Sequence, residues 1–216
     1  MENKLLHSDL NDGEVSAFEK ALAYCIGEEN AHAGTDALLE RFGSFSTVFS
    51  ARTEELCFIG GVNRNAALFI KLMAYLNSRR VTERFKFGNK YTELELREYI
   101  GALFLGSSVE TVYAILLDDE GRVVHTEHIS EGTMNASDVV PRKILECARR
   151  KGSKKIILAH NHPKGSATAS KDDIMTTGRL FNLFASVGVR LVAHYIVADG
   201  EVGVIDADML YNPNRQ

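Results

Sequence analysis

The spacing of apolar residues changes along the chain, from a helical period in its first part to a strand period later on. Within residues 1–80, apolar side chains recur every three or four positions, which is typical of amphipathic helices. From Glu110 onward, short apolar runs are separated by turn-forming residues and by two more helical segments. The pattern predicts helices over 14–26, 35–42, 66–76, 92–103 and 170–187, a shorter helix from Thr53, one capped by 135–137 and ended by Gly152, and strands over 112–117, 122–129, 156–159, 189–198 and 202–204.

This change of period predicts two domains. The helical part takes up residues 1–80, and a part with both strands and helices takes up residues 93–210. Between them, residues 81–92 are polar, carry charges of both signs and contain Gly88-Asn89, which is typical of a linker. Strands interleaved with helices predict a small α/β sandwich for the second domain.

Composition narrows the classes of protein that fit this pattern. The 216 residues are 45% apolar with a net charge of −4, and basic and acidic residues are nearly balanced in both halves. The chain therefore lacks the strong basic field of a dedicated nucleic-acid binder. The three cysteines include no Cys-x-x-Cys pair, and an odd number is best explained by reduced thiols. Without a signal peptide or a long apolar span, we expect a cytoplasmic protein with no membrane partner.

The strongest chemical signal is a pair of histidines at the end of the predicted strand 156–159. His160 and His162 are two positions apart, so in an extended segment both imidazoles point to the same side. Further on, Ser170 and Asp173 open the next predicted helix and share one of its faces. Two imidazoles, one carboxylate and a free fourth position are the ligand set of a catalytic zinc ion. Ser170 and Asp173 also form a plausible N-terminal helix cap, which needs no metal.

This arrangement of His-x-His-Pro followed by Ser-x-x-Asp resembles the JAMM (MPN-domain) zinc metallopeptidases, and Asn161 and Gly165 resemble their bacterial RadC-like branch. The resemblance extends over nearly the whole chain. It implies an MPN (JAMM, cytidine-deaminase-like) α/β sandwich with a mixed sheet, and one zinc ion per chain held by His160, His162, Asp173 and a water. It also implies hydrolysis of a peptide or isopeptide bond in an unidentified peptide or protein substrate. The sequence departs from the family's pattern at Lys164, Ala167 and Ala169.

A zinc-activated water needs a general base nearby. Spacing alone leaves four candidates open, which are Glu110, Glu120, Glu127 and Glu131. The resemblance favours Glu127, which precedes a Gly-Thr pair, with Glu131 as the second choice. It also implies that the hydroxyl of Ser170 helps to stabilise the developing oxyanion.

Other histidines of the second domain have roles that the sequence leaves open. His194 is expected to be a core histidine with satisfied hydrogen bonds, or else a partner of the zinc ligands. His125 shares a strand face with Glu127, so a role in the site is conceivable for it as well.

A second motif lies in the helical domain. Residues 54–76 resemble a helix-hairpin-helix, in which a glycine-rich turn lets backbone N–H groups approach a phosphate. Here the turn consists of Gly60, Gly61, Val62 and Asn63, and Arg64 is the basic residue beside it. The motif predicts weak, sequence-independent DNA contact through Gly60, Gly61, Asn63 and Arg64, or else only a tight turn between packed helices.

Two functions therefore compete. One is the zinc metallopeptidase, and the alternative is a non-catalytic, DNA-associated module of the DNA-repair type. A zinc nucleoside deaminase is disfavoured because the chain contains no Pro-Cys-x-x-Cys. The contiguous His-Asn-His also argues against an HNH nuclease, whose three residues are spread over a hairpin and a helix.

Overall fold

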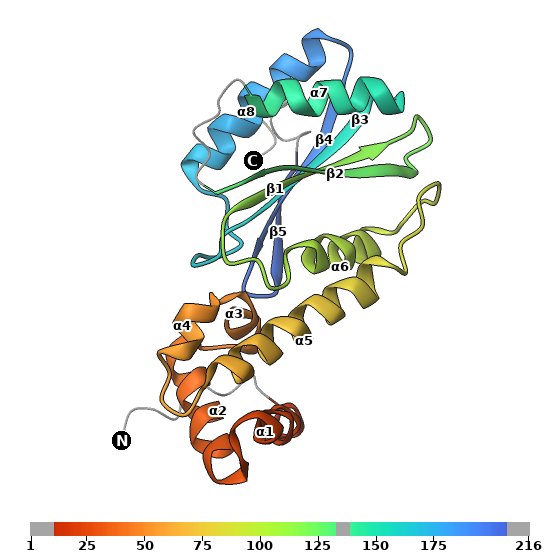
Figure 1. Cartoon of the computed structure of the whole chain (residues 1–216). Coiled ribbons are helices and arrows are strands. Elements are labelled where there is room, and N and C mark those ends of the chain that lie inside the picture. Colours follow the sequence, from red (N-terminus) through yellow and green to blue (C-terminus); the bar gives the residue numbers. More distant parts are fainter. Residues whose placement is uncertain (1–10, 133–138, 207–216) are drawn as a thin grey trace. The chain divides into compact units, whose positions relative to one another are not determined.

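The computed structural model describes residues 11–132 and 139–206 (Figure 1). The described elements are α1 (Asp12–Ile26), α2 (Glu28–Phe42), α3 (Phe45–Ser50), α4 (Thr53–Cys57), α5 (Arg64–Thr82), α6 (Glu93–Phe104), β1 (Thr111–Leu117), β2 (Val123–Glu131), α7 (Val139–Lys151), β3 (Lys155–Asn161), α8 (Lys171–Ser186), β4 (Arg190–Ala198) and β5 (Glu201–Asp206). None of the described helices combines the length and the apolar character needed to cross a bilayer. The helix cap expected at 135–137 and the tail from Tyr211 lie outside the described residues.

The chain folds into two compact units, and neither is one continuous stretch of sequence. The first unit comprises the chain up to Ser78 together with Leu105–Ser108. The second comprises Arg79–Phe104 and the chain from Val109 onward. An all-helical first part and a mixed α/β second part were expected, and this fold class is confirmed.

The second unit is built on a five-stranded mixed sheet in the order β2-β1-β3-β4-β5. β3 and β4 are parallel, whereas the other neighbouring pairs are antiparallel. The strands β1 and β3 have neighbours on both sides and helices on both faces, which explains their nearly unbroken apolar runs. β4 returns to β5 through Asp199 and Gly200, both at positive φ, as a two-residue hairpin turn requires.

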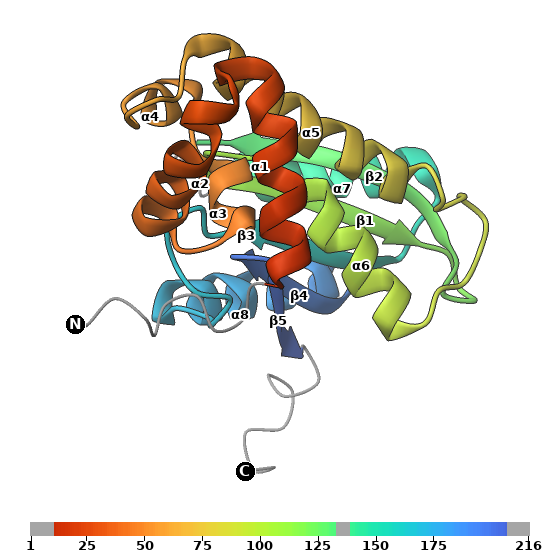
Figure 2. The same ribbon diagram turned by 90° about the horizontal axis from the view of Figure 1, so that it is seen from below.

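Each face of this sheet is covered by helices (Figures 1 and 2). α7 and α8 lie on one face, where the buried residues Ala114, Leu158 and Phe184 belong to one apolar core. α6 lies on the opposite face, where Tyr99 and Ile100 belong to a second core. Side chains alternate between the two faces along each strand, so the position of a residue on β3 decides which helices it meets.

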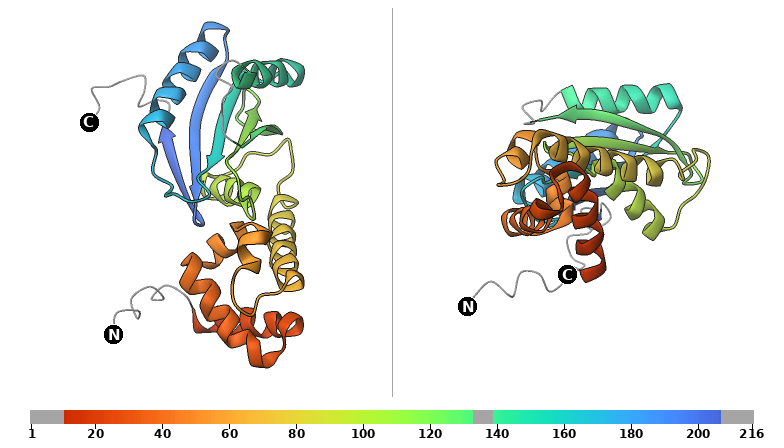
Figure 3. Two further views of the ribbon diagram at one scale, coloured as in Figure 1. Left: turned by 60° about the vertical axis from the view of Figure 1, so that its left-hand side comes forward. Right: turned by 60° about the horizontal axis from the view of Figure 1, so that its bottom comes forward.

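The first unit packs α1 to α4 beside the first part of α5 (Figure 3). Its most unusual contact is made by Lys71, which lies on α5 and is partly buried. The Lys71 Nζ donates hydrogen bonds to the carbonyl oxygens of Phe49, Ala51 and Gly106 at 2.7, 2.9 and 2.8 Å. Burial lowers the pKa of this amine, and the charge of Glu55 partly opposes that effect. Lys71 thus joins the C-terminal end of α3 to the returning segment Leu105–Ser108.

The sequence placed one helix start wrongly. Thr35 was expected to cap a helix, but α2 already begins at Glu28 and Thr35 is fully buried within it. Gly27, at φ 85°, lets the chain pass from α1 into α2 without an intervening loop. Gly34, which precedes Thr35, packs closely against Ile26. A Cβ added to Gly34 would lie 3.1 Å from the Cδ1 of Ile26. Small residues in the middle of α2 therefore serve helix packing, not capping.

The segment 81–92, expected as a linker, is partly folded. Its first two residues end α5. Phe85 stacks on Tyr91 and on Tyr99 with ring centroids 4.6 Å apart in both pairs, so these rings extend the core beneath α6. Backbone bonds from Gly88 to Val123 and from Val123 to Asn89 also fasten the segment to the start of β2.

Candidate metal centre

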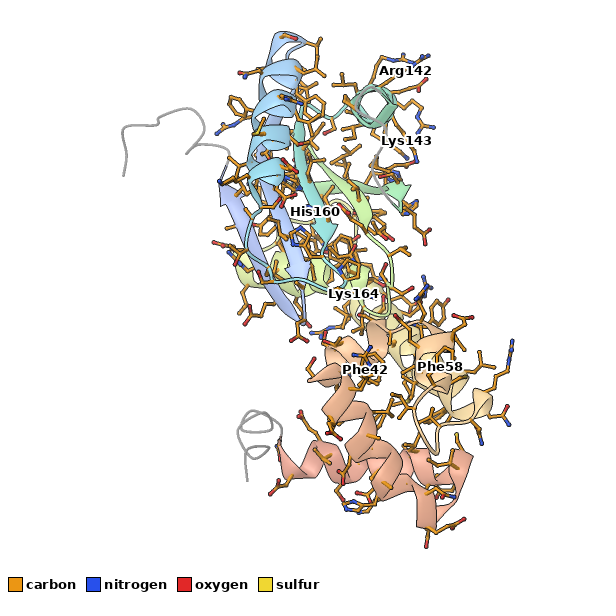
Figure 4. The ribbon with its side chains drawn as sticks, turned by 90° about the vertical axis from the view of Figure 1, so that its left-hand side faces the viewer. Phe42, Phe58, Arg142, Lys143, His160 and Lys164 are labelled. Atoms are coloured by element: carbon orange, nitrogen blue, oxygen red, sulfur yellow. The ribbon has the colours of Figure 1, made fainter. Side chains whose placement is uncertain are left out.

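His160 lies near the end of β3 (Figure 4), and His162 directly follows that strand. His160 pairs with Val112 of β1 and Ile196 of β4 and is only 3% exposed. The backbone N–H of His162 donates to the Val197 carbonyl at 2.8 Å, which continues the pairing with β4 past the end of the strand. Both imidazoles therefore stay on the side of the sheet that α8 covers, as the two-residue spacing predicted.

The carboxylate of the motif comes from the first turn of α8. Ser170 is the N-cap, and its Oγ accepts a hydrogen bond from the Asp173 N–H at 3.1 Å. In return, the Asp173 Oδ2 accepts from the Ser170 N–H at 2.7 Å and from its hydroxyl at 2.6 Å. Ser170 and Asp173 can therefore form the helix cap while Asp173 also serves as a metal ligand. The cap holds the Asp173 carboxylate in one orientation, with Oδ1 turned toward His160.

The donor atoms of three residues converge at this place. The Nε2 atoms of His160 and His162 are 2.9 Å apart. Asp173 completes the group, with Oδ1 at 3.1 Å from the first nitrogen and Oδ2 at 3.4 Å from the second. Ligands of a tetrahedral zinc ion with bonds of about 2.0–2.1 Å lie about 3.3 Å from each other. The contacts within the cluster, at 2.9, 3.1 and 3.4 Å, are close to that spacing.

The hydrogen bonds behind the ligands decide which nitrogens carry protons. The Thr177 hydroxyl donates to the Asp173 carbonyl, so its oxygen accepts from the Nδ1–H of His194 at 2.7 Å. The His194 Nε2 is then bare and accepts from the Nδ1–H of His160 at 2.8 Å. This chain of bonds leaves the His160 Nε2 with an unprotonated lone pair that points into the cluster.

The same holds for the other imidazole. The His162 Nδ1 lies 2.9 Å from the carbonyl oxygen of Ser166, which can only accept, so this nitrogen carries the proton. When His162 is neutral, two bare Nε2 lone pairs face each other at 2.9 Å beside a carboxylate. Such an arrangement is repulsive unless a proton or a cation lies between the atoms. The donor set thus fits a metal ion on the chemistry of its own atoms.

A fourth residue, the acidic Glu110, belongs to the same place. Glu110 directly precedes β1, and the amide of Asn161 fixes the backbone on both sides of it. The Asn161 Oδ1 accepts from the Thr111 N–H at 2.8 Å, while its Nδ2 donates to the Val109 carbonyl at 3.1 Å. The residue between the two histidines therefore positions Glu110.

The electrostatics of Glu110 reflect this position. Burial raises the pKa of its carboxyl, and the negative charge of Asp173 raises it further, while His162 lowers it. A carboxyl that is partly withdrawn from water and electrostatically coupled to two metal-ligand candidates has the properties of a proton acceptor at the cluster.

Comparison with known proteins gives the family. The family model for the RadC-like JAB domain matches residues 91–207, more than half of the chain. The chain belongs to the RadC-like JAB domain family. It is 32% identical to a UPF0758 protein of Vibrio parahaemolyticus over 167 residues, covering 77% of this chain and 75% of that protein. A UPF0758 protein of Vibrio cholerae is 35% identical over 176 residues, covering 80% and 78% of the two chains.

Within this JAB domain, the glutamate favoured from sequence does not join the cluster. Glu127 lies on β2, where it pairs with Ala114 of β1, which in turn pairs with Leu158 of β3. Strand spacing and rise per residue put its Cα about 12 Å from that of His160. Its Oε2 lies 2.9 Å from the His125 Nε2 and 3.6 Å from the Cys147 Sγ. These contacts also lower the pKa of Glu127, chiefly through the bond to His125.

The other proposed residues have the following places. Glu131, at the end of β2, pairs with Thr111 and is exposed. Glu120 lies in the β1–β2 turn, in an ion pair with Arg122. Ser170 acts as a cap whose hydroxyl is bonded to Asp173, so its role as an oxyanion donor stays a prediction. His194 is fully enclosed and bonded on both nitrogens, as a partner of a zinc ligand would be.

The hairpin between α4 and α5 is a separate place in the helical unit. The Asn63 Oδ1 accepts from the Ala66 N–H at 2.9 Å, and its Nδ2 donates to the Cys25 carbonyl at 3.1 Å. Asn63 thereby caps α5 and ties the turn to the end of α1. Gly61 adopts φ 84°, and Gly60 and Arg64 are exposed. These contacts give the turn a structural role, and DNA contact through it remains a prediction.

The loop after the histidines, residues 163–169, lies against β5. An added Cβ on Gly203 would be 2.0 Å from the Ala167 carbonyl oxygen, so only glycine fits there. Lys164, one of the departures from the family's pattern, lies in this loop (Figure 4). The loop therefore packs against β5. This packing fixes the Ser166 carbonyl, which accepts a hydrogen bond from His162.

The buried histidines predict a pH dependence for the metal-free chain. Burial lowers the pKa of His160 from 6.5 to about 4 and that of His194 from 6.5 to about 3. Between pH 6.5 and 4 the unfolded chain binds protons that the folded chain does not. The contribution of these histidines to the free energy of unfolding is therefore fully present above pH 6.5. It falls on acidification, by up to about 1.4 kcal/mol per pH unit for each histidine.

Urea unfolding of the metal-free chain at pH 7.5 and pH 5 measures this loss. A His194→Gln variant serves for comparison, since it removes one of the two titrating groups and should reduce the difference between the two pH values. Equal stability of the wild-type chain at both pH values would contradict the buried, neutral state of these imidazoles.

Proposed function

We propose that this protein is a zinc-dependent peptidase that hydrolyses a peptide or isopeptide bond in a peptide or protein substrate. The observation that carries the proposal is the convergence of two Nε2 atoms and one carboxylate, with the partly buried Glu110 coupled to them. Three protein ligands, in contrast to four, leave a position for water and substrate, as in catalytic zinc sites.

The ligands proposed for zinc are His160, His162 and Asp173, one ion per chain. When bound, zinc would supply Lewis acidity, which lowers the pKa of a coordinated water toward about 7 and polarises the scissile carbonyl. The fit rests on the donor atoms themselves, since their spacing and their protonation both suit a divalent cation.

The residues around the ligands have distinct tasks in this proposal. The Glu110 carboxylate accepts the proton of the attacking water and delivers it to the leaving amine. Its raised pKa brings the carboxyl nearer to the pH at which it can do both. His194 and Thr177 hold His160 in the tautomer whose Nε2 is free, and Ser170 orients Asp173. These are positioning residues.

The test combines metal content with cleavage. The purified full-length chain, digested with a peptide library and with isopeptide-linked model substrates, is expected to cleave a subset of them. A chelator should abolish the cleavage and zinc should restore it. A chain that carries one zinc ion at the cluster but cleaves neither library would overturn the peptidase proposal while leaving the metal site intact.

A further inference from the structure

A second group of potential ligands lies on the same face of the sheet, between β2 and α7. His125 and Glu127 are two residues apart on β2, so their side chains share this face. Cys147 faces them from α7 and is fully buried. The Glu127 Oε2 lies 2.9 Å from the His125 Nε2 and 3.6 Å from the Cys147 Sγ, and one ligand atom from each residue lies within 4.8 Å of the other two.

We propose that His125, Glu127 and Cys147 form a second metal site, for zinc or a similar thiophilic divalent cation, that joins α7 to β2. A thiolate, an imidazole and a carboxylate together are a donor set that borderline-soft ions such as zinc prefer. Zinc bonds of about 2.3 Å to sulfur and about 2.1 Å to oxygen place these two ligand atoms about 3.6 Å apart in a tetrahedron. The contact between Cys147 and Glu127 has this length.

This site is separate from the cluster at the end of β3. The strand register puts Glu127 two strands and two residues away from His160, about 12 Å between their Cα atoms. Among the described residues, no ligand belongs to both groups. Each can therefore be removed without removing the other.

The access to the site and its charge determine how tightly it binds. The side chains of His125 and Glu127 are 22% and 26% exposed, which leaves an approach for the ion and for a water as fourth ligand. Arg150 interacts with both Cys147 and Glu127. Its charge stabilises the ionised ligands but repels a cation, so this site is the weaker of the two.

The thiol also makes the site recognisable by spectroscopy. The cluster at the end of β3 contains only nitrogen and oxygen donors, whereas this one contains sulfur. Cobalt(II) replaces zinc in such sites, and a cobalt–thiolate bond gives a charge-transfer absorption in the near ultraviolet. Titration of the reduced, metal-free full-length chain with cobalt(II) is expected to give this absorption with the second equivalent of metal.

Matched variants identify the ligands. Cys147→Ser should abolish the thiolate absorption and reduce the bound cobalt from two equivalents to one. His125→Asn, at a partly exposed strand position, should weaken the second equivalent at least about 10-fold and tests the site even if Cys147→Ser fails to fold. Cys25→Ser and Cys57→Ser, in the helical unit, should keep the absorption, and so should His160→Ala.

Several results would overturn the proposal. The first is a wild-type chain that gives no thiolate absorption at saturating cobalt. The second is an absorption that survives Cys147→Ser or disappears with Cys25→Ser or Cys57→Ser, because the thiol involved would then be another one. The third is undiminished binding of the second equivalent by His125→Asn.

Discussion

Glu110→Gln is expected to lower turnover about 10²–10⁴-fold while the zinc content stays at the wild-type level. Glutamine keeps the size and the polarity of the side chain but cannot accept the proton of the attacking water. Glu110 is not one of the three proposed ligands, so the metal should remain bound. Single-turnover cleavage of a substrate from the peptide library, at matched zinc content, measures the effect.

The choice of glutamate can be checked against its competitors. Glu120→Gln removes a carboxylate of the same length from the exposed β1–β2 turn and should leave turnover within about two-fold of wild type. A loss of turnover confined to Glu127→Gln would mean that Glu127, the glutamate favoured from sequence, is the base and that Glu110 is not. A loss confined to Glu131→Gln would point to the neighbouring position at the end of β2.

Removal of a ligand should have the largest effect on the metal itself. His162→Ala or Asp173→Ala leaves two protein ligands, and the purified variant should lose its zinc on dialysis against a chelator that the wild-type chain withstands. His194→Gln disturbs only the partner of a ligand, so the zinc affinity should fall by about 10–100-fold without complete loss. Elemental analysis and competition with a chromogenic chelator distinguish the two cases.

His32→Ala is the matched control for these variants. His32 lies on α2 in the helical unit, 73% exposed, beside Glu19 and Asp36. Its removal should change neither the zinc content nor the affinity. Full zinc occupancy in His162→Ala or Asp173→Ala would contradict the assignment of the cluster.

The sequence was sufficient to predict that the proposed metal ligands lie together, because their placement depends on local geometry. His160 and His162 are neighbours on one strand, and Ser170 and Asp173 belong to one helical turn, so periodicity alone brings each pair together. Pro163 and the short loop leave few ways to join the two pairs. The Ser170 cap could also be foreseen from residue type and spacing.

The proposed base, Glu110, could not be chosen in the same way, because its position depends on which strands pair. β1 runs antiparallel to β3, so the residue before β1 meets the end of β3, where the histidines lie. That neighbourhood requires the strand order, which no local pattern contains. One signal in the sequence could have pointed to Glu110. It precedes an apolar strand of the same length as β3, so antiparallel pairing of these two strands would bring it to the histidines. The role of His194 depended on long-range contacts as well, because Thr177 and His160 reach it from other elements.

The segment Leu105–Ser108 determines where chimaeric versions of this chain can be joined. It folds with the helical unit, although the sequence on both sides of it belongs to the sheet unit. Its Gly106 supplies a carbonyl to Lys71, and its backbone lies so close to α5 that an added Cβ would be 3.1 Å from the Cβ of Ala74. A gene fusion with one junction near residue 80 therefore separates partners that fold together. An exchange of the helical unit between relatives must therefore also transfer these four residues. The unit that folds together is larger than the continuous helical sequence before residue 80.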